Sequence, residues 1–336
     1  MSKLIIPKDY EPILDYGQTQ LAIKKLNDYF QKELAYYLVL RRTTAPLFVT
    51  PESGLNDNLN GVERTVDFTL KDMAEKPVEV VQSLAKWKRM ALRKYNVGPG
   101  KGIYTEMSAI RRDEELDNFH SIYVDQWDWE KTIEKENRTE LYLKDAVLDI
   151  WAVMKSTEAF VMNQYPEIYL GMPEDLFFIS AQELEDKYPD KTPEEREELI
   201  TKEKRAVFVT QLGHKMNSGE RHADRAPDYD DWDLNGVLIV WNDVLECAMR
   251  LSSMGIRVDD SALLKQLEDA NAMERKGLDF HNKILNNELP YSIGGGIGQS
   301  RLCMYFLKKA HIGEVQVSIW PEEMIEECAK NNITLL

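Results

Sequence analysis

The chain has 336 residues, 43% of them hydrophobic and 30% charged, so it can bury a substantial core as one large domain or two intimate ones. Its formal net charge of −16 argues against a protein whose main task is to grip a nucleic-acid backbone. No apolar run approaches the roughly 18 residues that span a bilayer, and the first residues do not resemble a signal peptide. Three scattered cysteines favour reduced thiols in a cytoplasm over disulfides or a zinc site.

The first hundred residues predict two helices separated by extended chain. Residues 17–38 place apolar side chains mostly three to four positions apart, as an amphipathic helix does. A partly β-branched stretch follows and is interrupted by Pro46. Residues 77–81 then predict a short strand, and residues 82–95 predict a helix.

The middle of the chain predicts a strand, two helices and a long loop. Residues 121–130 alternate between two faces, which predicts a strand, and residues 139–163 predict a long helix. A further helix begins at Thr192, where Thr-Pro-Glu-Glu offers an N-cap, a proline at the first position and a capping-box Glu195. The polar, glycine-punctuated residues 211–236 predict a functional loop, because loops of that length are seldom idle connections.

The C-terminal third predicts consecutive strands and a glycine run. Strands at 237–241 and 251–258 precede a helix from about residue 260 to 286, and a final helix follows residues 292–302, which read SIGGGIGQSRL. Such a run either lets main-chain amides approach a phosphate or makes a tight strand-to-helix turn. Consecutive strands without long intervening helices predict a largely antiparallel α+β fold. Glycines this near the C-terminus exclude a Rossmann arrangement.

Four polar clusters are candidates for chemistry. In the first, a charged loop precedes a strand with Gln126, Asp128 and Glu130 on one face, which would make a poor core and a good lining for a polar ligand. The alternative is a solvated loop before an ordinary strand. The other clusters are Ser83 with Lys88, Arg257 at the end of an apolar strand, and Arg301 after the glycines. For Lys88 and Arg257 the alternative is an exposed surface charge.

These features resemble the class II aminoacyl-tRNA synthetase fold. Arginine followed by Asp-Glu ahead of a strand resembles its motif 2, the glycine run ending in Arg-Leu resembles motif 3, and the helix and strand reaching Pro46 resemble motif 1, the dimer element. Within that fold the chain is similar over nearly its whole length to AsnA-type asparagine synthetases, which use ammonia. Six stretches match in order: DNLNG, SLAKWKR, SIYVDQWDWE, RAPDYDDW, SSMGIRVD and IGGGIGQSRL.

The resemblance implies a single catalytic domain over residues 1–336, with a mainly antiparallel sheet flanked by helices. It also implies a cytoplasmic homodimer that acts on L-aspartate, ammonia and ATP with Mg²⁺, and that binds neither nucleic acid nor membrane. The residues implied in ATP binding are Arg111, Glu114, Arg225, Gly296 and Arg301. The family pattern favours Arg111 over Arg112 for the α-phosphate. The residues implied in aspartate binding are Ser83, Lys88, Gln126, Asp128, Asp230, Ser253 and Arg257.

The implied reaction has two steps. The side-chain carboxylate of aspartate attacks the α-phosphate of ATP, giving β-aspartyl-AMP and pyrophosphate, and ammonia then displaces AMP to form asparagine. Positioning and charge stabilisation by Arg111, Lys88 and Mg²⁺ would dominate the first step. In the family the aspartate of DNLNG, here Asp57, binds ammonium and accepts its proton.

Two positions depart from the family pattern. An acidic residue is usual immediately before LSSMG, where this chain has Arg250, and this departure leaves the metal ligands unknown. Glu246 would lie one helical turn earlier if that segment is helical, which makes it a candidate ligand. Gln82 stands where some relatives have histidine, and glutamine keeps the ability to donate a hydrogen bond.

Two other functions are compatible with parts of the sequence. An aspartyl- or asparaginyl-tRNA synthetase would need an anticodon-binding domain, for which no residues remain, and the acidic balance disfavours it. The second alternative is a non-catalytic paralogue that senses aspartate or adenylate. Arg250 is the one sequence feature that favours it.

Overall fold

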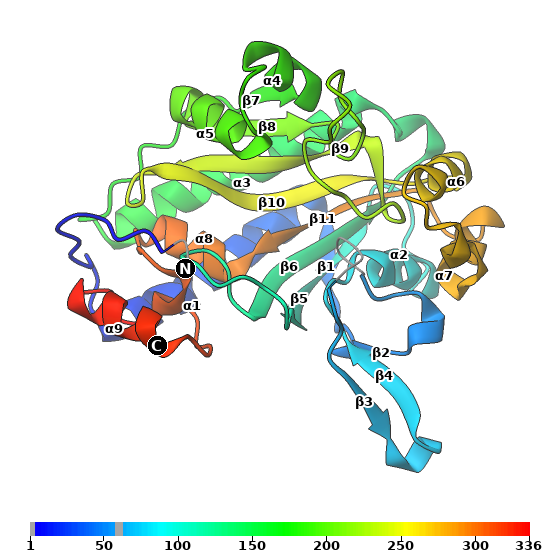
Figure 1. Cartoon of the computed structure of the whole chain (residues 1–336), viewed down its shortest axis with the longest axis horizontal. Helices are drawn as coiled ribbons and strands as arrows, with labels where there is room; N and C mark the ends of the chain where they lie inside the picture. The colour runs from blue at the N-terminus through cyan, green and yellow to red at the C-terminus, as the bar shows by residue number, and fades with distance from the viewer. Residues whose placement is uncertain (1–3, 58–62) are drawn as a thin grey trace.

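An eight-stranded sheet forms the centre of the molecule (Figure 1). The computed structural model of the chain describes residues 4–57 and 63–336. The strand order is β1-β5-β6-β11-β10-β9-β8-β7; the edge pairs β1–β5 and β7–β8 are parallel and the inner pairs are antiparallel. The predicted α+β class with a mainly antiparallel sheet is therefore confirmed. The strands are β1 (Leu40–Arg42), β5 (Gly102–Ile110), β6 (Tyr123–Thr132), β7 (Phe177–Ser180), β8 (Ala206–Thr210), β9 (Asp230–Asn242), β10 (Cys247–Arg257) and β11 (Ser292–Gly298).

Helices cover both faces of this sheet. Along β8, Ala206 and Phe208 pack into the largest apolar cluster with α1, α3 and α8, whereas Val207 and Val209 pack on the other face with α4 and α5. This alternation is the two-residue period of a strand buried on both sides. The helices are α1 (Tyr16–Leu38), α2 (Ala85–Lys94), α3 (Glu140–Gln164), α4 (Ala181–Lys187), α5 (Pro193–Lys204), α6 (Asp260–Asp269), α7 (Asp279–Leu285), α8 (Gln299–Phe306) and α9 (Glu322–Lys330).

The face that carries α4 and α5 is only partly covered by helices. α5 packs on β8, β9 and β10, and α2 packs over β6 and β11 further along the sheet. α6 and α7 adjoin α2 at that end of the molecule (Figure 1). The sheet surface between α5 and α2 carries the pocket described below.

A three-stranded sheet projects from the body of the molecule (Figure 1). Its order is β2-β4-β3, with β2 (Phe48–Val49), β3 (Asp67–Leu70) and β4 (Lys76–Val80). The strand predicted at 77–81 is β4. Short 3₁₀ helices occupy Pro51–Ser53, Lys71–Met73, Lys135–Asn137, Met273–Gly277 and Ile312–Glu314.

Local sequence explains where the long helices begin. The side chain of Asp15 caps α1 in a capping box with Gln18, and the buried stripe of α1 repeats every four residues at Ala22, Leu26, Phe30, Leu34 and Leu38. Thr192 caps α5 by accepting from the backbone of Glu195, with Pro193 at the first helical position. The start of α5 is therefore as predicted.

Two sequence-based boundaries are wrong, and the condition that made Glu246 a candidate ligand is not met. The predicted loop 211–236 ends at residue 229, because β9 already begins at Asp230. The predicted helix over 260–286 is two helices, α6 and α7, joined by the 3₁₀ helix Met273–Gly277. β9 and β10 form a hairpin whose turn covers residues 243–246, so the segment before Arg250 is not helical.

Candidate active site

A cavity of about 450 Å³ opens on the sheet face between α5 and α2. Its floor is made by β6, β10 and β11, and its walls by α2, the loop at 111–121 and the loop before β9. All the residues predicted to bind aspartate or ATP line it, together with the predicted catalytic Asp57: Ser83, Lys88, Arg111, Glu114, Gln126, Asp128, Arg225, Asp230, Ser253, Arg257, Gly296 and Arg301. Segments up to 259 residues apart in the sequence, from Asp57 to Gln316, therefore meet in one place.

The glycine run lies in β11, a central strand between β6 and β10, and α8 follows it directly. A Cβ on Gly294 would lie 2.0 Å from Oε2 of Glu130 and 2.6 Å from Nη2 of Arg257, and a Cβ on Gly296 would lie 2.3 Å from Oε1 of Gln126. The tight-turn alternative therefore fits only Gly298, which precedes α8, and not the glycines inside the strand. These glycines leave room for polar side chains of the neighbouring strands to lie across the pocket floor.

Buried ion pairs form one end of the pocket. Arg257 is 2% exposed and donates to Glu130 through Nε and Nη2, the latter at 2.7 Å, and to Asp230 through Nη1. Burial opposes the charged form, but Glu130 and Asp230 raise the pKa of Arg257 overall. The alternative of an exposed surface arginine is therefore wrong. Three of its five N–H groups are used by these carboxylates, which leaves one on each terminal nitrogen without a partner among the described residues and available to a ligand.

Lys88 forms a second buried pair beside Arg257. Its ammonium group contacts Asp128 and donates to the carbonyl of Gly295 at 2.8 Å. Burial lowers the pKa of Lys88. Within residues 4–57 and 63–336, the second carboxylate oxygen of Asp128 is buried without a hydrogen-bond partner. A buried acceptor left unpaired is costly unless a ligand donates to it, so Asp128 fits an ammonium group.

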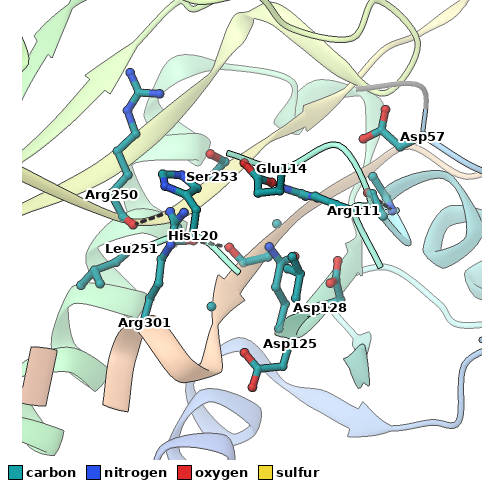
Figure 2. A pocket seen from close by; sticks show the side chains of 18 of the residues that line it. Asp57, Arg111, Glu114, His120, Asp125, Asp128, Arg250, Leu251, Ser253 and Arg301 are labelled. Atoms are coloured by element: carbon teal, nitrogen blue, oxygen red, sulfur yellow. Dashed lines mark hydrogen bonds and ion pairs between the residues drawn. The ribbon is translucent and has the colours of Figure 1, made fainter. Parts of the chain in front are cut away.

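Arginines gather at the other end of the pocket, where Figure 2 shows Arg111, Arg250 and Arg301 around Glu114 and His120. Arg111 is lightly held, since its bonds to the Gln82 carbonyl are 3.4 and 3.5 Å long and Glu114 lies 3.8 Å away. Arg301 donates to the carbonyls of Phe119 and Arg250 at 3.2 and 3.1 Å.

Positive charge at this end is incompletely neutralised. Burial, followed by the like charge of Arg111, lowers the pKa of Arg301 to about 10. Arg225 donates to Asp230 through Nη2 at 2.7 Å, while its Nε is buried without a partner among the described residues. Mutually repelling guanidinium groups with unused donors fit a polyanion such as a nucleotide phosphate chain.

Asp57 lies in the same pocket, near Arg111 (Figure 2). It is 2% exposed, and its backbone is fixed by two neighbours: the Asn56 side chain accepts from its N–H at 3.0 Å, and Gln82 donates to its carbonyl at 3.0 Å. Gln82 also accepts from Arg111. The rest of the DNLNG stretch, residues 58–61, lies outside the described residues.

The described residues provide no protein-held metal site. No group of three or more histidine, cysteine, aspartate or glutamate side chains placed to hold an ion occurs within 4–57 and 63–336. Glu246 does not line the pocket; it is an exposed residue in the β9–β10 turn with φ 51°. The prediction that made it a candidate ligand assumed a helical turn, and the hairpin removes that geometry.

Comparison with known proteins identifies the family. A family model described as aspartate-ammonia ligase matches residues 17–332. A Clostridium tetani protein named aspartate–ammonia ligase is 60% identical, and the match covers 99% of this chain and 98% of that one. A Ruminiclostridium cellulolyticum protein of the same name is 57% identical over the whole of both chains. The chain belongs to the aspartate–ammonia ligase family.

Solved structures show that this aspartate–ammonia ligase family member has the class II aminoacyl-tRNA synthetase fold. Entamoeba histolytica asparaginyl-tRNA synthetase in complex with asparaginyl-adenylate matches with a TM-score of 0.64 at 14% identity, covering 90% of this chain and 66% of that one. The Pyrococcus horikoshii asparaginyl-tRNA synthetase complexed with asparaginyl-adenylate matches with a TM-score of 0.58 at 15% identity, and the match covers 90% of this chain and 70% of that one. This chain therefore spans about two thirds of the length of those synthetases. No helix within its described residues is long and apolar enough to cross a membrane.

Sequence reasoning missed several residues that line the pocket of this family member. His120, whose Nδ1 lies 2.9 Å from Asp117, sits in the charged loop already singled out. Tyr229 and Asp224 adjoin residues that were predicted, so proximity in the sequence was an available signal. Gln316 comes from beyond α8, where nothing in the sequence pointed to the site. Arg112, the rejected alternative to Arg111, does not line the pocket.

Proposed function

We propose that this chain joins L-aspartate and ammonia to form L-asparagine, converting ATP to AMP and pyrophosphate through a β-aspartyl-adenylate. Membership of the aspartate–ammonia ligase family supports the reaction. The observation that carries the assignment to this pocket is its polarity. Considering only the residues that the structure describes, paired ions and an Asp128 oxygen without a hydrogen-bond partner lie at one end, and arginines with unused donors lie at the other.

In the first step the aspartate side-chain carboxylate attacks the α-phosphorus of ATP, and the bond to the β-phosphate oxygen breaks to release pyrophosphate. Asp128, Asp230 and Gln126 would receive the substrate ammonium group, while Lys88 and the unused N–H groups of Arg257 would meet its carboxylates, with Ser253 and Ser83 beside them. These contacts would leave the attacking carboxylate facing the arginine end of the pocket.

Arg111 would contact the α-phosphate as charge develops there. It suits this role because its present hydrogen bonds are long, so little has to be broken when the phosphate binds. Arg301, Arg225 and Glu114 would hold the rest of the nucleotide over Gly296. Fixed positive groups of this kind stabilise the transition state without reorganising.

In the second step ammonia attacks the acyl carbon of the mixed anhydride, and AMP leaves with the electrons of the carbon–oxygen bond. Ammonium is not a nucleophile, so a base must take its proton. Asp57 would do so, because it lines the pocket beside Arg111 and its backbone is held by Asn56 and Gln82.

Magnesium is proposed as a companion of ATP, bound through phosphate oxygens, which is its usual mode in nucleotide enzymes. Since the described residues offer no cluster of ligands, no step here is routed through the ion. We further propose that the protein works in the cytoplasm as a homodimer.

AMP formation measured with aspartate and ATP, with and without ammonium, tests the function. We expect AMP release to require both aspartate and ammonium, and asparagine to appear in equal amount. AMP release that needs tRNA in place of ammonium would favour a tRNA synthetase, and binding of aspartate and ATP without turnover would favour a sensor.

A further inference from the structure

Arg250 stands at an irregular point of β10. The register against β9 shifts between Arg250 and Ser252, which marks a β-bulge, and bulges commonly re-aim a side chain beside a functional site. The carbonyl of Arg250 accepts from Nη1 of Arg301 at 3.1 Å. Arg250 lines the pocket, and Figure 2 shows this residue at the end opposite Asp57.

The guanidinium of Arg250 is held in place from one side. Its Nε and Nη2 both donate to the carboxylate of Glu197 on α5, each at 2.7 Å. Glu197 is only 4% exposed and also contacts Nε2 of His222 at 2.9 Å, so the strand, the helix and the loop before β9 meet at this carboxylate. Burial opposes its ionisation, but His222 and Arg250 lower the pKa of Glu197 overall, so it stays charged.

This arrangement leaves the Arg250 guanidinium oriented and able to bind an anion. Within the part of the chain that the structure describes, Nη1 makes no hydrogen bond, and the side chain is 41% exposed. Fixing two of the three guanidinium nitrogens removes most of the ordering entropy that a free arginine would lose on binding an anion.

We propose that Arg250 binds the β- or γ-phosphate of ATP, with Glu197 as the residue that positions it. The inference rests on the proposed function, because it needs ATP in this pocket. It assigns a protein cation to the part of the nucleotide that leaves as pyrophosphate, at a site where no cluster of carboxylates is placed to hold a metal ion among residues 4–57 and 63–336. AMP lacks both phosphates, so Arg250 makes no contribution to AMP binding.

Equilibrium binding of ATP and AMP to the purified protein tests this, by calorimetry in EDTA and again in excess Mg²⁺ without aspartate. In Arg250→Ala we expect ATP affinity to fall about tenfold, the effect of losing one charge-assisted hydrogen bond, with AMP affinity unchanged. The loss should be larger in EDTA than in Mg²⁺, because the cation partly neutralises the same phosphates. Glu197→Gln should lower ATP affinity less than Arg250→Ala does and leave AMP affinity unchanged, because Arg250 keeps its charge but is less firmly held.

Arg93→Ala is the matched control, since Arg93 is 44% exposed and pairs with Glu288 at 2.6 Å outside the pocket. Arg250→Gln, which can still donate to Glu197, serves if the alanine variant does not fold. The inference is overturned if these Arg250 variants keep the wild-type ratio of ATP to AMP affinity, or lose both affinities equally. If the wild type binds ATP but forms no asparagine, the proposed function fails. The inference about Arg250 is then still decided by the ratio of ATP affinity to AMP affinity in the variants.

Discussion

At the scale of single residues, the site is a set of charges whose partners define their roles. Asp230 joins the two ends of the pocket, because it contacts both Arg257 and Arg225. Aspartate and nucleotide would therefore be bound by one connected network. Arg111 and Arg301 lie outside that network. Among the residues that the structure describes, they bond only to backbone carbonyls and the distant Glu114, so they can be altered with less effect on the fold.

Replacing Arg111 or Arg301 with alanine should cripple adenylate formation. Each loses a preorganised charge at the reacting nucleotide, which typically lowers the rate on the order of 100-fold or more. Aspartate-dependent exchange of pyrophosphate into ATP measures this step without ammonia. Arg112→Ala, outside the pocket, is the control and should exchange normally. Near wild-type exchange in both variants would show that the nucleotide lies elsewhere.

Asp57→Asn should separate the two half-reactions. The substitution keeps the size of the side chain but removes the carboxylate that would bind and deprotonate ammonium, while the aspartate and ATP contacts come from other residues. Pyrophosphate exchange should survive, and asparagine formation should fall about 100-fold or more. Hydroxylamine, which is neutral and nucleophilic near pH 7, should rescue turnover better than ammonium does. Equal loss of exchange and synthesis would mean that Asp57 shapes the whole pocket.

At the scale of elements, β11 positions the site because its glycines leave space above the strand. Gly294→Ala should destabilise the fold by about 1–3 kcal/mol, the usual range for overpacking, because the new methyl group would displace Glu130 and Arg257. Denaturant unfolding measures the loss, and KM for aspartate should rise with it. Gly98→Ala meets no heavy atom within 4 Å and is the control. Equal stability of the two variants would contradict the role given to Gly294.

Periodicity and caps were enough to predict elements whose signal is local, such as α5 with its Thr192 capping box. The break between α6 and α7 was missed because residues 273–277 carry no proline, and only Gly277 interrupts the pattern there. Strand alternation was enough to predict that Gln126 and Asp128 line a polar ligand, whereas the family motifs supplied the roles of the site residues. Contacts between distant segments had no sequence signal: Glu197 meets His222 and Arg250, which are 25 and 53 residues further along the chain.

At the scale of the whole molecule, exposed apolar side chains collect on the segment that resembles the dimer element. Tyr36, Val39 and Leu47 are 79%, 52% and 52% exposed, between the end of α1 and β2. Phe48 and Phe68 stack edge to face on the small projecting sheet and are each 40% exposed. Single exposed apolar residues are ordinary, but several on one short segment favour a surface that a second copy covers.

We therefore expect a dimer in solution, measured as a mass near twice 39.0 kDa by light scattering. The double variant Tyr36→Lys with Val39→Lys should shift the protein to monomer, because burying two new charges at an interface costs more than the lost apolar contact alone. Tyr169→Lys is the control, since Tyr169 is 71% exposed elsewhere on the surface and its replacement should leave the mass unchanged. A monomeric wild type would remove the homodimer from the proposal. A dimer that survives the double substitution would place the interface on another face.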